Sequence, residues 1–109
     1  MNWKEFRDME GLETIKLASK EMPQVIFKHS TRCSISTMAK SRLERSEVPS
    51  NAVFNYLDLI AHRNVSNKIA DDFNVEHASP QVLIIKNGEC IYDESHNAIN
   101  MDEIAELVI

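Results

Sequence analysis

Short apolar runs alternate with segments of helical periodicity along this chain, and this order constrains the fold more than any other feature. Strand-like runs occupy residues 25–27, 52–59 and 81–86, and between them the apolar residues recur every three or four positions. Strands that alternate with helices predict a mostly parallel sheet covered on both faces. The Asn87-Gly88 pair favours a hairpin, which adds an antiparallel strand at residues 89–93. The expected fold class is therefore α/β with a mixed central sheet.

Helix boundaries follow from capping residues and a proline. Asp8 is a plausible N-cap for a first helix whose apolar pattern continues to residue 22, where Pro23 stops it. Asn64 can cap a helix over residues 65–73. A last helix is expected to open at Asn100 or Asp102.

Two features complete the predicted sheet and its cover. A helix follows Cys33 and ends at about residue 45 or 46. Its apolar side is predicted to contain Ile35, Met38, Ala39 and Leu43. Trp3 and Phe6 indicate a short first strand, so the sheet has four strands, or five if this one is present.

Composition and length limit the class of protein. With 109 residues we expect one domain, residues 1–109, with a core that needs no disulfides or metal. No apolar run approaches the ~20 residues of a membrane span, and the N-terminal residues lack the apolar core of a signal peptide. Two cysteines without an export signal indicate a reducing cytoplasm, and we expect no membrane partner.

Charge is distributed unevenly along the chain. The net charge of −5 argues against a nucleic-acid partner. Residues 28–45 carry a net charge of +4, whereas the remainder carries −9. This basic region is either a solvated helix face or a surface that favours a thiolate and attracts an anionic thiol or disulfide.

Cys33 lies where a strand hands over to a helix. The sulfur is therefore expected in the first helical turn, where free N–H groups and the helix dipole favour thiolate over thiol. Because a thiolate is the nucleophile in disulfide exchange, Cys33 is the candidate catalytic residue; the alternative is an inert packed thiol. Ser36 occupies the position three residues on, where a dithiol redox protein carries its resolving cysteine.

Four segments carry a resemblance to a known family: Thr-Arg-Cys-Ser-Ile-Ser at residues 31–36, residues 66–70, residues 75–81 and residues 95–99. The chain resembles the thioredoxin superfamily and, within it, the monothiol bacilliredoxins, glutaredoxin-like proteins of bacteria that make bacillithiol. The family often has Thr-Cys-Pro-Ile-Ser at this site. Here Arg32 precedes Cys33, and Ser34 stands in place of the proline.

The resemblance implies a thioredoxin-like fold and reversible exchange at Cys33 with protein–bacillithiol mixed disulfides. Bacillithiol or a similar small thiol would be a co-substrate, with no bound cofactor. The partners would be S-thiolated client proteins, and the protein would be a monomer. Because no second cysteine lies nearby, a second small thiol must free the adduct.

We expect a substrate-binding set around Cys33 made of Arg32, Ser34, Ser79, Pro80 and Gln81, in which the resemblance implies the role of Pro80. Pro80 would be a cis-proline facing Cys33, although most X–Pro bonds are trans. The backbone of Ser79 could then pair with a disulfide substrate as an added strand does. Gln81 is a candidate side-chain contact, and Arg32 is either a favourable charge or a solvated side chain.

The remaining candidates each have two interpretations. Ser36 either hydrogen-bonds the thiolate or satisfies an N–H group at the helix start. His77 and His96 either move a proton or bind an anion, or they are surface residues. Cys90 is either a packed strand residue or a distant resolving thiol. The chain has no Cys-x-x-Cys or Cys/His pattern with zinc spacing, so no metal is expected.

Two further functions stay open at this stage. One thiolate per chain plus a small thiol could bridge an iron–sulfur cluster between two subunits, as in monothiol glutaredoxins, although their Cys-Gly-Phe-Ser run is absent. A thioredoxin-like fold could also serve as a binding module without chemistry.

Overall fold

Five strands form one mixed sheet in the computed structural model, which describes residues 1–108. The strand order is β1-β3-β2-β4-β5. Strands β1 (Lys4–Glu5), β3 (Val53–Asp58) and β2 (Gln24–His29) run parallel. Strands β4 (Gln81–Lys86) and β5 (Glu89–Ser95) each run antiparallel to the neighbour before them. The predicted mixed sheet is confirmed, and the short first strand makes it five-stranded.

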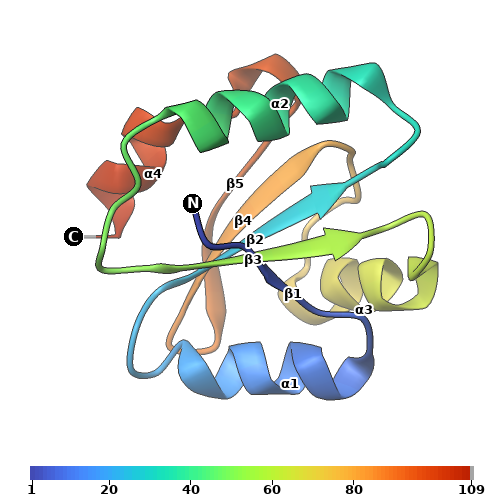
Figure 1. The fold of residues 1–109 in the computed structure, drawn as a ribbon. Helices are drawn as coiled ribbons and strands as arrows, with labels where there is room; N and C mark the ends of the chain where they lie inside the picture. Colours follow the sequence, from blue (N-terminus) through green and yellow to red (C-terminus); the bar gives the residue numbers. More distant parts are fainter. Residues whose placement is uncertain (109) are drawn as a thin grey trace.

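Two pairs of helices cover the sheet (Figure 1). Helices α1 (Met9–Ala18) and α3 (Arg63–Phe73) lie on one face, and α2 (Ser34–Arg45) and α4 (Met101–Leu107) lie on the other. A short 3-10 turn, His96–Ala98, leads from β5 toward α4. Among residues 1–108, none of the helices has the length and apolar character that a membrane crossing requires.

The central strand β2 is buried along its whole length, and its side chains pack in two apolar layers, one on each face of the sheet. Because successive strand residues point to opposite faces, Val25 and Phe27 pack in the layer of α2 and α4, whereas Ile26 packs in the layer of α1 and α3. The apolar run at residues 25–27 predicted this core. The strand extends one residue before it and two beyond it, and these added positions are polar yet buried.

Local capping chemistry sets several boundaries as expected. The Asp8 carboxylate accepts a hydrogen bond from the Gly11 N–H at 2.7 Å and caps α1. Asn100 caps α4 by accepting from two N–H groups of its first turn. Asn87 and Gly88 have φ of 54° and 78°, the left-handed backbone that this two-residue hairpin turn requires.

Two predicted helix boundaries are wrong. Helix α1 ends at Ala18 rather than residue 22, because the Ser19 hydroxyl and carbonyl accept the N–H groups of Gly88 and Asn87 in the β4–β5 hairpin. Helix α3 begins at Arg63, so Asn64 is not its cap. The turn after β3 brings the chain into the helix earlier than the capping pattern indicated.

The predicted inner side of α2 is also partly wrong. Ile35 and Met38 are 47% and 62% exposed, whereas the buried positions are Ser36, Ala39 and Leu43. These three lie at i, i+3 and i+7, which is a regular helix face. A small polar residue therefore occupies the inward position nearest the start of the helix, and the apolar residues beside it face outward.

Candidate functional site

Cys33 is the N-cap residue of α2 and is half-buried. Its N–H donates to the Ser30 carbonyl at 3.2 Å, which closes the turn between β2 and the helix. Its carbonyl accepts from the N–H and the hydroxyl of Thr37 at 3.1 and 3.2 Å. The backbone thus holds the thiol at the positive end of a 12-residue helix.

Ser36 lies one turn into the helix, and its hydroxyl is bonded to the strand before it. The side chain is 0% exposed. Its Oγ accepts from the Ser30 N–H at 3.0 Å and lies 2.8 Å from His29 Nδ1. Among the hydrogen bonds of residues 1–108, none joins this hydroxyl to Cys33. The sequence predicted either a hydrogen bond to the thiolate or a hydrogen bond to a backbone N–H at the helix start. The observed bond is of the second kind, and its donor, the Ser30 N–H, precedes the helix.

His29 is a site residue that the sequence analysis gave no role. Its ring stacks on Phe27 and contacts Tyr56, with centroid separations of 5.7 and 5.9 Å. Burial lowers the pKa of His29, and the nearby charge of Lys40 lowers it further. The imidazole beside Ser36 is therefore biased toward its neutral form. In the sequence, the one signal that could have pointed to His29 is its position just after the apolar run at residues 25–27.

The loop before β4 reaches the same end of the sheet as Cys33. Lys28 pairs with Gln81 in the antiparallel ladder, so Pro80 lies beside the end of β2 from which the chain turns toward Cys33. The Ser79–Pro80 peptide bond is cis, as the family resemblance implied. Neither the N–H nor the C=O of Ser79 is bonded within residues 1–108, and its buried hydroxyl has no partner there.

Gln81 serves its own loop rather than a surface. The side chain is buried, its Nε2 donates to the Glu76 carbonyl at 3.0 Å, and its Oε1 accepts from the Ala78 N–H at 3.4 Å. The amide is thereby occupied within the protein. The predicted substrate contact through this side chain stays a prediction.

Lys28 and His77 also meet beneath this loop. Lys28 Nζ donates to the Ser66 carbonyl at 3.1 Å and lies 3.3 Å from His77 Nδ1, and Ser66 Oγ lies 3.3 Å from the same nitrogen. Burial lowers the pKa of Lys28 to about 8. The sequence analysis counted Lys28 in an exposed basic region, which is wrong because the side chain is fully buried.

The other predicted residues lie in different settings. Arg32 and Ser34 flank Cys33 and are exposed. His96 is exposed, has φ of 57°, and its N–H donates to the Pro80 carbonyl. Lys40 of α2 forms an ion pair with Glu44 at 2.8 Å, so the positive charge of this helix is partly neutralised.

Cys90 lies at the opposite end of the sheet. It pairs with Ile85 next to the β4–β5 hairpin, whereas Cys33 follows the other end of the β2–β4 ladder. Its thiol donates to the Tyr92 carbonyl at 3.2 Å, and burial raises its pKa. Cys90 is a packed strand residue. The interpretation as a distant resolving thiol is wrong, because Cys33 and Cys90 lie at opposite ends of the sheet.

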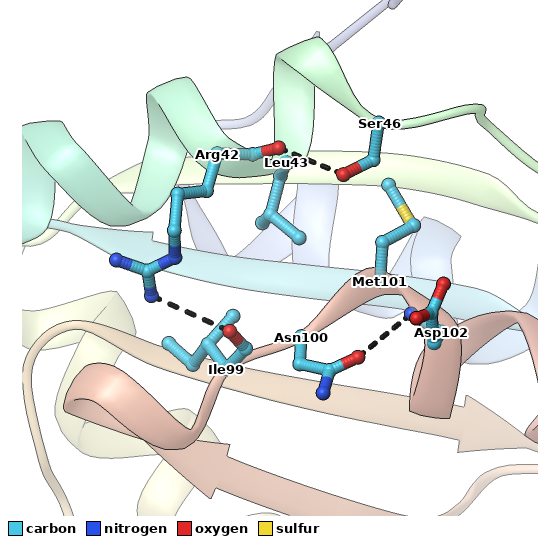
Figure 2. A pocket seen from close by; sticks show the side chains of 7 residues that line it. All are labelled: Arg42, Leu43, Ser46, Ile99, Asn100, Met101 and Asp102. Atoms are coloured by element: carbon cyan, nitrogen blue, oxygen red, sulfur yellow. Dashed lines mark hydrogen bonds between the residues drawn. The ribbon is translucent and has the colours of Figure 1, made fainter.

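A cavity of about 200 Å³ lies away from the thiol, between the end of α2 and the start of α4 (Figure 2). Arg42 spans it and donates to the Ile99 carbonyl at 3.3 Å. Residues 1–108 contain no group of three His, Cys, Asp or Glu side chains placed to hold a metal ion.

A family model described as monothiol bacilliredoxin BrxC matches residues 4–104. The chain belongs to this family. A bacilliredoxin assignment agrees with a single thiol at a helix start and no sulfur in the next turn. It supports a thiol oxidoreductase role for the chain.

Solved structures agree on the fold. A candidate oxidoreductase with a thioredoxin fold superimposes with a TM-score of 0.79 at 27% identity, covering 95% of this chain and 91% of that one. Thioredoxins of Malassezia sympodialis and Fasciola hepatica give TM-scores of 0.76 and 0.75 at 14% and 18% identity. They cover 98% and 96% of this bacilliredoxin, and 88% and 95% of their own chains. At such identities these two thioredoxins establish the fold alone.

Proposed function

We propose that this protein removes bacillithiol, or a similar small thiol, from S-thiolated client proteins through Cys33. The observation that carries the proposal is the half-exposed thiol at the N-cap of α2, with an oxygen-bearing residue instead of a sulfur one turn on. A helix N-terminus stabilises the negative charge that the attacking sulfur must carry.

The exchange takes two steps. The Cys33 thiolate attacks the small-thiol sulfur of the mixed disulfide, a new S–S bond forms, and the client leaves as its thiolate. A second small-thiol molecule, as thiolate, then attacks the adduct. It takes the first small thiol away as a symmetrical disulfide and returns Cys33 as thiolate. In the net exchange the entering small thiol is oxidised, the client cysteine is reduced, and the disulfide that leaves joins the entering thiol to the one that came from the client.

Two features of the surroundings support this route. Ser36 offers no sulfur and its hydroxyl is bonded to the end of β2, and Cys90 lies in β5 at the opposite end of the sheet, so we assign resolution to an external thiol. The N–H and C=O of Ser79 make no hydrogen bond within residues 1–108, lie at the same end of the sheet, and can pair with the bound disulfide.

Intact mass spectrometry tests the proposal. Incubation with a cysteine peptide disulfide-bonded to bacillithiol is expected to give one bacillithiol adduct on the wild-type chain and none on Cys33→Ala. Cys90→Ala is the matched control, because it removes the other thiol and keeps the adduct. The proposal fails if the wild-type chain forms no adduct or if Cys33→Ala forms as much.

A further inference from the structure

Lys28 is a fully buried lysine in the central strand that makes no salt bridge within residues 1–108. Its ammonium group has only donors, so the His77 Nδ1 at 3.3 Å must accept. The His77 ring is then neutral, with its proton on Nε2. Burial lowers the pKa of His77, and the charges of Lys28 and Arg63 lower it further, which agrees with a neutral ring.

The loop at residues 74–80 rests on two neighbouring side chains of the sheet. Lys28 and Gln81 stand directly opposite each other in the β2–β4 ladder, and both are buried. Lys28 reaches the His77 ring, and Gln81 holds the Glu76 carbonyl and the Ala78 N–H. Three consecutive residues of the loop are thereby tied to the sheet just before Ser79 and Pro80.

An apolar side chain would fill the space of Lys28 without the cost of burying a charge. What the ammonium adds is a pair of hydrogen bonds, one to the Ser66 carbonyl of α3 and one to His77 in the loop. Lys28 is thus the one side chain that joins the central strand, α3 and this loop at a single atom in the described chain.

We propose that Lys28 is a positioning residue for the exchange reaction, acting through His77 on the loop that presents Ser79 to the substrate disulfide. This inference rests on the proposed exchange at Cys33. It assigns to a buried residue of the central strand an effect on substrate binding, while the nucleophile itself is left as it was.

The test is single-turnover adduct formation with the bacillithiol-bearing peptide at several concentrations. In Lys28→Met and in His77→Ala, the half-saturating concentration is expected to rise about 10-fold, the effect of one hydrogen bond to a charged group, with the maximal rate within about twofold. His77→Asn retains an acceptor close to the position of Nδ1 and should return to within about threefold of wild type. The double variant should be no weaker than either single one, because both changes break one contact.

Alkylation of Cys33 by iodoacetamide is the internal control, because this small reagent needs no loop, and its rate should match wild type in every variant. Lys68→Met, which removes an exposed lysine of α3, is the matched control with unchanged half-saturation. The proposal is overturned if the two single changes add, if alkylation falls with exchange, or if His77→Ala binds like wild type. The His77 variants carry the test should Lys28→Met not fold. A wild-type chain that is alkylated but forms no adduct would instead remove the proposed function.

Discussion

Replacing Ser36 with alanine removes a buried hydroxyl that joins the start of α2 to the end of β2. Two hydrogen bonds are lost, one from the Ser30 N–H at 3.0 Å and one with His29 at 2.8 Å. The His29 contact contributes about 1 kcal/mol, and the Ser30 N–H, a buried donor left without a partner, costs about 1–3 kcal/mol. We therefore expect Ser36→Ala to lower the free energy of unfolding by about 2–4 kcal/mol. For a domain of this size, the midpoint of thermal unfolding falls by roughly 8–15 °C.

Urea unfolding of Ser36→Ala and Ser34→Ala, side by side, measures this effect. Ser34 lies two residues away on the same helix, is exposed, and its hydroxyl makes no hydrogen bond within residues 1–108. Its alanine variant should lie within about 0.5 kcal/mol of wild type. If the two variants unfold at the same urea concentration, the Ser36 hydroxyl does not hold the strand-to-helix turn, and the reasoning from its two contacts is refuted.

The remaining predictions concern Lys28, two histidines and the two cysteines. Burial lowers the pKa of Lys28 from 10.5 to about 8. Between these two pH values the unfolded chain still binds the proton that the folded chain has released. The free energy of unfolding of the wild type should therefore rise from pH 8 to pH 10.5 relative to that of Lys28→Met. Burying the ammonium group costs free energy at pH 7, and its hydrogen bonds to Ser66 and His77 offset part of that cost, so Lys28→Met is expected to unfold at a urea concentration no lower than that of wild type. Burial lowers the pKa values of His29 and His77. As pH falls below about 6.5, the unfolded chain therefore binds protons before the folded chain does, and the free energy of unfolding should decrease. The urea midpoint should be lower at pH 5 than at pH 7, and the decrease should be smaller in His77→Asn. Oxidation with diamide should give no intramolecular disulfide between Cys33 and Cys90 by peptide mapping, since the sheet separates them; a linked peptide would contradict the register of β4 and β5.

The elements that sequence reasoning predicted best have strong local signals. The apolar run at residues 81–86, followed by Asn87 and Gly88, indicated strand, turn and strand, because only a left-handed backbone closes so tight a hairpin. Asp8 and Asn100 marked helix starts, since their side chains satisfy free N–H groups of the first turn. Where a boundary depended on a distant partner, as at Ser19 and the hairpin, the local pattern misplaced it.

The candidate site divides in the same way. A cysteine between a strand and a helix pattern was sufficient to place the thiol at the start of α2, because that geometry depends on neighbours in sequence. In contrast, the hydrogen-bond partners of Ser36 and the exposure of Ile35 and Met38 depend on how α2 packs against the sheet. Periodicity assigned the inner face to apolar residues, and the structure gives the first inward position to a serine.

The amino-acid sequence by itself determined the alternation of strands and helices, the hairpin turn and the place of the thiol at a helix start. Each of these follows from interactions within a few residues. Only the tertiary structure decided that Lys28 is buried and meets Ser66 and His77, which lie 38 and 49 residues further along the chain. A charged side chain can leave water only where donors and acceptors from distant segments converge, and no local pattern records that convergence.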